Sequence, residues 1–337
     1  MSDILEKLKS VEFNPFLELI DIGYTEELKA VTYHHFDEWI SEGFHGPLNY
    51  LSDERKEKRK NIQSIFPQAK SLVTLGISYE KFHRFFWRFI EKQEKYNGLK
   101  IASFALAFNG YDYHLELSRL LNPLKLLGFI DVMPVLDRDI FYRSGLGWYG
   151  KNSMMINPHY GSFFMIYSFI LEEKIAFNFS KQTQMRDHCG TCTACLDSCP
   201  TTAIIPQKRT IDAAKCISTF TIEEFKDKVP PVGYVENNQE IFGCDICQDV
   251  CPWNKKIGRK DKKLNDYYDL LMEDFIEKNP LLKKIVHFFY LTPLDEIERN
   301  ISDMSNNDYR RFFYQTSFYR LGKRGMIKNL RPFLNDS

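Results

Sequence analysis

The chain lacks the features that mark membrane-bound, exported or strongly charged proteins. Its 45 Lys and Arg balance 45 Asp and Glu, so the formal net charge is zero and a uniformly basic nucleic-acid binder is excluded. No run approaches the ~18 consecutive apolar residues of a transmembrane helix. Residues 1–7 hold neither an apolar signal core nor a twin-arginine pair, so we expect a cytoplasmic protein with no membrane partner.

Cysteine is absent from the first 188 residues and the last 86, and all eight cysteines lie between. The group Cys189-x2-Cys192-x2-Cys195-x3-Cys199-Pro200 has the spacing of a bacterial ferredoxin motif, in which three thiolates bind one [4Fe–4S] cluster and the fourth binds another. A second group is Cys244-x2-Cys247-x3-Cys251-Pro252, with Cys216 alone before it. The spacing predicts two clusters, held by a first set (Cys189, Cys192, Cys195, Cys251) and a second set (Cys199, Cys216, Cys244, Cys247).

Structural zinc and disulfides are the alternatives for these cysteines. Zinc sites are typically built from pairs of C-x2-C, which a triple motif followed by Cys-Pro fits poorly. Disulfides are rare in the reducing cytoplasm. Because 188 residues precede the first cysteine, we expect the N-terminal region to hold a substrate or second cofactor that the clusters reduce.

The first half of the chain predicts a mixed α/β region. Short apolar runs predict buried strands over 71–79, 101–108, 129–136 and 162–171. Apolar residues at helical spacing predict helices over 82–90 and 113–127, the second broken near Pro123. From about residue 257 the pattern is helical, and basic residues gather at 255–263 and 310–331.

A glycine-rich segment, Gly145–Asn152, matches G-x-G-x-x-G and differs from a P-loop only at its last position. Such nucleotide motifs follow a strand, whereas residues 137–144 are polar and helix-like, and Asn152 lacks the hydroxyl that binds magnesium. We therefore reject a nucleotide site. The three glycines still indicate that the backbone closely approaches a ligand or a neighbouring element.

Several motifs resemble, in order along the chain, those of epoxyqueuosine reductases. They are Asp112-Tyr113-His114, the D-x-x-P-V-L-x-R segment Asp131–Arg138, the G-L-G-W-x-G-K-N segment Gly145–Asn152, Cys216-Ile217-Ser218, and the G-C-D-x-C-Q to C-P-W-N-K segment Gly243–Lys255. The match begins at about Arg59 and continues weakly at Gly322–Gly325.

The resemblance implies a cobalamin-dependent oxidoreductase that reduces epoxyqueuosine to queuosine at the wobble position of tRNA with a GUN anticodon. Two [4Fe–4S] clusters would pass electrons to cobalamin from an external low-potential donor of the ferredoxin or flavodoxin type. The implied class is α+β, with an α/β cobalamin-binding catalytic domain over 1–180 and a ferredoxin-like domain with two [4Fe–4S] clusters over 181–256. A short helical, HEAT-like region over 257–337, at most one helical pair, would contact tRNA.

Site residues follow from the same resemblance. Asp131 would be the general acid that protonates the leaving oxygen, which requires burial against the corrin to raise its pKa; a turn carboxylate before Pro134 is the alternative. Lys151 would meet cofactor amides or tRNA phosphate. The implied cobalamin contacts are Arg59, Ala105, Asp131, Met155, Ile166, Ser218 and Gly243. The implied tRNA contacts are Lys255, Lys256, Arg310, Arg311, Lys323 and Arg324, with a solvated helix face as the alternative.

Two other function classes share part of this pattern. A reductive dehalogenase also uses cobalamin and two clusters, on small organohalides, but such enzymes usually carry an export signal. A non-enzymatic electron-transfer or cluster-assembly adapter would bind clusters without a corrinoid. The basic C-terminal stretches favour a polyanionic substrate and hence the tRNA enzyme.

Overall fold

The centre of the computed structural model, which describes residues 2–130, 133–174, 185–225, 228–234, 239–257 and 262–334, is a four-stranded sheet. Its order is β1 (Glu18–Thr25), β2 (Ser71–Ser78), β7 (Phe164–Leu171) and β4 (Leu127–Phe129). All three pairings are antiparallel. The described sheet is therefore antiparallel, as in α+β proteins, whereas the α/β domain that the resemblance implied for 1–180 would have parallel strands.

The two central strands are almost entirely buried. All eight residues of β2 are buried, and six of the eight residues of β7 are buried as well. The hydroxyls of Thr74 and Ser168 lie 3.0 Å apart between these strands, so that each buried hydroxyl has a partner. The strands predicted over 71–79 and 162–171 are confirmed.

Five helices accompany the sheet: α1 (Ser2–Lys9), α2 (Tyr33–Ser41), α3 (Glu80–Ile90), α4 (Tyr113–Leu121) and α5 (Asp137–Arg143). α3 buries Phe82, Phe85 and Phe86, as its helical spacing predicted. α4 ends where the 3-10 turn η5 (Asn122–Leu124) begins, which confirms the break at Pro123. Further 3-10 turns are η1 (Asn49–Leu51), η2 (Glu57–Lys60), η3 (Ile62–Ser64) and η4 (Ser103–Ala105).

Two predicted strands are wrong over most of their length. In the range 101–108 the strand β3 (Lys100–Ile101) ends at Ile101. The turn η4 follows at once, and the Ser103 N–H donates to the Asp245 carboxylate at 2.8 Å instead of to a neighbouring strand. In 129–136 the strand β4 ends at Phe129, before Pro134, which lacks an N–H for a ladder. A short, fully buried apolar run looks the same in sequence whether it is a strand or a turn.

The cysteine-bearing segment consists of small elements: α6 (Ala194–Asp197), β8 (Ile204–Ile205), β9 (Thr210–Ile211), α7 (Ile217–Ile222), β10 (Glu240–Phe242), α8 (Ile246–Asp249) and α9 (Pro252–Lys255). β8 and β9 form an antiparallel pair, whereas β10 pairs in parallel with β3 of the N-terminal region. A hairpin of β5 (Trp148–Tyr149) and β6 (Met155–Ile156) completes the strands. The segment is therefore bonded to the N-terminal region through its backbone.

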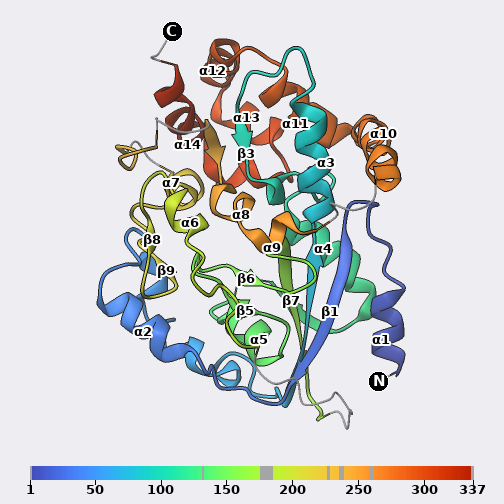
Figure 1. The fold of residues 1–337 in the computed structure, drawn as a ribbon, viewed down its shortest axis with the longest axis vertical. Helices are drawn as coiled ribbons and strands as arrows, with labels where there is room; N and C mark the ends of the chain where they lie inside the picture. The colour runs from blue at the N-terminus through green and yellow to red at the C-terminus, as the bar shows by residue number, and fades with distance from the viewer. Residues whose placement is uncertain are drawn as a thin grey trace.

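The C-terminal region is helical, as predicted, with α10 (Lys262–Lys278), α11 (Pro280–Tyr290), α12 (Leu294–Asp303), α13 (Asn306–Phe312), η6 (Ser317–Leu321), α14 (Gly322–Leu330) and η7 (Arg331–Phe333). Five α-helices exceed the single helical pair that we expected. One hydrophobic cluster runs from Leu8 to Leu330 through residues of all three regions. In Figure 1 the helices α10–α14 occupy the upper part, and α8 and α9 lie between them and the β5–β6 hairpin. In the described part of the chain, no helix is long and apolar enough to cross a membrane.

Candidate iron-sulfur and catalytic site

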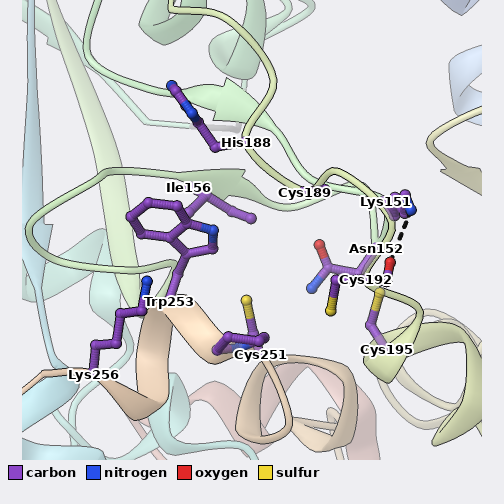
Figure 2. Close-up of a pocket in the computed structure, with 11 residues that line it drawn as sticks. Lys151, Asn152, Ile156, His188, Cys189, Cys192, Cys195, Cys251, Trp253 and Lys256 are labelled. Carbon is purple, nitrogen blue, oxygen red and sulfur yellow. Dashed lines mark hydrogen bonds between the residues drawn. The ribbon is translucent and has the colours of Figure 1, made fainter.

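The first set of cysteines lines one cavity of about 170 Å³. Cys189 and Cys192 lie on a turn in which the Cys192 N–H donates to the Cys189 carbonyl at 3.0 Å. Cys195 lies in α6, and Cys251 precedes α9, where Pro252 takes the first helical position that needs no N–H. Figure 2 shows the thiols of Cys192, Cys195 and Cys251 around a common space. The fold thus brings together four thiols from two distant segments.

The second set is carried by the short helices α6–α8 and their ends, and its four side chains are partly exposed. Cys216 precedes α7, Cys247 lies in α8, Cys199 follows α6 and Cys244 lies two residues before α8. Burial raises the pKa of Cys216, and the Cys199 thiol adds to this shift. Burial raises the pKa values of Cys244 and Cys247 well above their usual range, and Cys216 contributes to both. Each of these shifts therefore includes a contribution from another thiol of the second set, as the predicted ligand set requires.

The sulfur chemistry of both sets fits an iron-sulfur cluster. Burial, with the Cys189 and Cys251 thiols, raises the pKa of Cys195 to about 11. Four thiolates at such short range repel each other unless a cation lies among them, so iron binding would displace protons from the thiols. The Ala203 N–H also donates to the Cys199 sulfur at 3.3 Å, the kind of hydrogen bond that tunes cluster potentials.

Arg59, the first predicted cobalamin contact, has an unsatisfied group. Its side chain is buried beside the ring of Phe36, with the guanidinium carbon 5.7 Å from the ring centre. Burial lowers the pKa of Arg59, and its Nη1 has no hydrogen-bond partner among the described residues. A buried N–H without an acceptor is costly, so this guanidinium fits an acceptor supplied by a bound molecule.

The other described cobalamin candidates fall into two places. Gly243 has φ +70°, a Cβ on it would lie 2.5 Å from the Cβ of Ala102, and its N–H donates to the Thr221 hydroxyl of α7 at 3.0 Å. Ser218 lies in the same helix, and Ala105 is fully buried in η4. Met155 and Ile166 pack together in a separate apolar cluster. Asp131, the predicted general acid, lies outside the described residues.

The basic residues predicted to contact tRNA are not equivalent. Exposed side chains are those of Lys255, Lys256, Arg310, Arg311 and Arg324. The Lys256 ammonium lies 4.4 Å from the centre of the Trp253 ring. Lys323 instead donates to the carbonyls of Ser302 and Met304 at 2.7 and 2.6 Å, so its ammonium satisfies the C-terminal end of α12.

Sequence reasoning missed a buried polar network beside the second set. The His83 ring bonds the Asp249 carboxylate at 2.9 Å and the Ser103 hydroxyl at 2.7 Å, and stacks on Phe163 with ring centres 4.0 Å apart. Burial raises the pKa of Asp245, which accepts from the Ser103 N–H, to about 6. Asp245 and Asp249 flank Cys247 in sequence, but nothing in the sequence pointed to His83 as their partner.

Comparisons with known proteins agree with this site. Residues 188–254, which contain all eight cysteines, match the 4Fe-4S double cluster binding domain. The chain is similar to an epoxyqueuosine reductase of Cyclobacterium marinum, at 38% identity over 65% of this chain and 69% of the relative. It is 35% identical to an epoxyqueuosine reductase of Leadbetterella byssophila, over 79% of this chain and 87% of the relative.

Solved structures show the same fold. An epoxyqueuosine reductase of Streptococcus thermophilus superposes with a TM-score of 0.69 at 20% identity, covering 99% of this chain and 81% of that one. An epoxyqueuosine reductase solved with an epoxyqueuosine-modified tRNA-Tyr stem loop gives a TM-score of 0.67 at 23% identity, covering 99% and 80%. Because the sequence relatives are more than 30% identical over most of their length, the chain belongs to the epoxyqueuosine reductase family.

Proposed function

We propose that this chain reduces epoxyqueuosine to queuosine at the wobble position of a tRNA with a GUN anticodon. The observation that carries the proposal is a match to a double [4Fe–4S] cluster domain over 188–254, with four of its cysteines around one cavity, in a member of this family. The family relative bound to an epoxyqueuosine-modified stem loop supports tRNA as the substrate. Removing the epoxide oxygen as water needs two electrons and two protons, and iron-sulfur clusters deliver electrons one at a time.

The first set would hold one [4Fe–4S] cluster and the second set the other. We propose three functional regions, with catalysis in 1–180, cluster binding in 181–256 and tRNA contact in 257–337. Electrons would enter at the first set, whose cavity is lined by the exposed residues His188 and Lys256, and pass to the second set. An external low-potential donor of the ferredoxin or flavodoxin type would supply them.

Cobalamin would be the redox partner of the second set. Arg59, Ala105, Met155, Ile166, Ser218 and Gly243 would hold it, and the unpartnered Arg59 Nη1 and the Gly243 backbone at φ +70° support that role. When bound, cobalamin would supply a strongly reducing cobalt centre for the epoxide. Asp131 would donate the proton to the leaving oxygen, for which its pKa must be raised by burial.

The tRNA would lie across the exposed basic residues Lys255, Lys256, Arg310, Arg311 and Arg324, whose phosphate contacts give a salt-dependent affinity. The wobble base would be turned out of its stack to reach the pocket, as in other enzymes that act on a base. Because the substrate is tRNA, we place the reaction in the cytoplasm.

The test is anaerobic reconstitution of the full chain with iron, sulfide and cobalamin, followed by incubation with a chemical reductant and epoxyqueuosine-containing tRNA. Nucleoside mass analysis should then show queuosine in place of epoxyqueuosine. The Asp131→Asn variant should keep both cluster spectra and lose most of the conversion. No conversion by wild-type protein that holds both clusters and cobalamin would contradict the proposal.

A further inference from the structure

The glycine-rich motif folds into the β5–β6 hairpin. A Cβ on Gly147 would lie 2.4 Å from the Ile156 carbonyl oxygen, so a side chain there would separate the two strands. Trp148 pairs with Ile156, and the Gly150 N–H donates to the Met154 carbonyl at 2.8 Å. The motif therefore shapes a tight turn, residues Gly150–Met154, which we call the hairpin tip.

Lys151, at the hairpin tip, contacts the first set. Its ammonium donates to the carbonyls of Gly190 and Cys192 at 2.7 and 2.8 Å (Figure 2 draws the bond to Cys192). It also lines the cavity that the four thiols of this set enclose. Two of its three N–H donors are thus used by the cysteine loop itself.

Asn152, the next residue, contacts the second set. Its side chain is buried, and its Nδ2 donates to the Cys247 carbonyl at 3.2 Å. Its Oδ1 accepts from the Met154 N–H at 3.2 Å, which fixes the amide within the turn. Consecutive residues of one turn therefore bond the backbone of one cysteine from each set.

The hairpin tip is also fixed from its other side. Arg138 donates to the carbonyl and the hydroxyl of Ser153 at 2.6 and 2.9 Å, and Ser153 has a positive φ of 66°. Arg138 is the second residue of α5 and the last residue of the D-x-x-P-V-L-x-R motif, which starts at Asp131. The tip is thus bonded both to the segment that contains Asp131 and to both cysteine sets.

We propose that the hairpin tip is a clasp that fixes the two cysteine sets relative to each other, and that Lys151 raises the reduction potential of the cluster in the first set. The proposal rests on the ligand sets of the proposed function. Reduction adds one electron, supplied by an external reductant, to a cluster that already carries four thiolates. A cation held beside it stabilises the added charge, and two carbonyl bonds keep this ammonium from swinging into solvent.

Lys256 provides a matched control, because it lines the same cavity but lies over the Trp253 ring and is exposed. Its charge faces solvent, so its removal should change the potential less than removal of the Lys151 charge. The experiment compares wild type, Lys151→Gln, Lys151→Arg, Lys256→Gln and Asn152→Ala as full chains reconstituted with iron and sulfide. Iron and sulfide content, and potentials from EPR-monitored titration with dithionite, are measured for each.

Lys151→Gln should keep both clusters and lower the potential of one of them, with about a tenfold smaller equilibrium constant for one-electron reduction, or about 59 mV. Lys151→Arg should retain most of the wild-type potential, because it keeps the charge. Asn152→Ala should leave that potential in place and release iron faster to a chelator.

Equal shifts in Lys151→Gln and Lys256→Gln, or unchanged potentials in Lys151→Gln with full iron, would overturn the role of Lys151. Iron release by Asn152→Ala at the wild-type rate would overturn the clasp. A failure of the proposed function is distinguishable, since wild type that holds both clusters but converts no epoxyqueuosine still gives measurable potentials. Missing iron in the wild type itself would contradict the ligand sets.

Discussion

The two cysteine sets differ in what surrounds them. The first set lines a cavity whose wall includes the exposed residues His188 and Lys256. The second set, whose four side chains are all partly exposed, is instead bordered by α7, α8 and β10. The first set therefore faces residues that a partner protein can reach, whereas the second set lies next in sequence to Ser218 and Gly243, which we propose to hold cobalamin.

The C-terminal helix α14 bonds the elements that border the second set. Lys328 donates to the carbonyls of Phe220 and Glu224, at the end of α7. Asn329 donates to the carbonyls of Thr221 and Ile241, both at 2.8 Å. The helical region thus supports the elements that contain Ser218 and Gly243, in addition to any contact with tRNA.

The largest expected effect comes from Cys216→Ala, which would remove the remote ligand of the second set. We expect the iron content to fall from about eight to about four per chain and conversion to fall by about a hundredfold or more. Iron and sulfide analysis with EPR of the reduced protein measures this. Cys189→Ala is the matched variant for the first set and should remove the other cluster signal. Full iron content in Cys216→Ala would contradict the ligand assignment.

Asn329→Leu tests whether α14 supports the second set. The change leaves the Thr221 and Ile241 carbonyls buried without a donor, so the free energy of unfolding should fall by about 2–4 kcal/mol. Urea unfolding of the reconstituted protein measures it. Arg324→Leu, on an exposed position of the same helix, should change stability by no more than about 0.5 kcal/mol. Equal effects of the two variants would show that α14 does not hold the site.

The contribution of Lys328 to the free energy of unfolding should depend on pH. Burial lowers the pKa of Lys328 to about 8, below the usual value of 10.5. Between these values the unfolded chain binds the proton and the folded chain does not, so stability rises with pH. Relative to Lys328→Met, the wild type should gain up to about 2 kcal/mol of unfolding free energy between about pH 7.5 and 9.5. Urea midpoints across that range test this, and a difference that stays flat or falls would contradict it.

The sequence predicted the chemistry of the site better than its surroundings. Ligand spacing in Cys189–Cys199 is a local property, because a turn and a short helix set the distances between the thiols. The strands over 71–79 and 162–171 were predictable because long apolar runs with β-branched and aromatic residues favour a buried sheet. By contrast, the run 101–108 became a turn because a carboxylate 142 residues away, on Asp245, accepts the Ser103 N–H.

The role of the Gly145–Asn152 motif could not be predicted from the sequence either. Its glycines indicated close packing, but only the fold shows that the partner is the hairpin's own strand β6 and that Lys151 and Asn152 meet the cysteine loops. The same holds for Lys323, which looked like a free cation in a basic stretch and is bonded to two carbonyls. All basic residues look equivalent in a sequence, whereas tertiary contacts decide whether a given side chain can bind a phosphate.

The smallest effect is expected on tRNA affinity. It can be compared between two pairs of exposed basic residues, one at the end of α9 and one in α13. The double variants Lys255→Gln/Lys256→Gln and Arg310→Gln/Arg311→Gln each remove two exposed charges. If each cation contacts a phosphate, the slope of log affinity against log salt should become shallower by about 0.7–0.9 per residue. Affinity at a single salt concentration should fall only modestly, so the slope is the better measurement. Lys323→Gln is the comparison, because its ammonium is already bonded to the Ser302 and Met304 carbonyls and should leave the slope unchanged. If the loss of one pair leaves the slope at the wild-type value, that pair lies on a solvated face that does not contact tRNA. The tRNA would then lie against the other pair of basic residues.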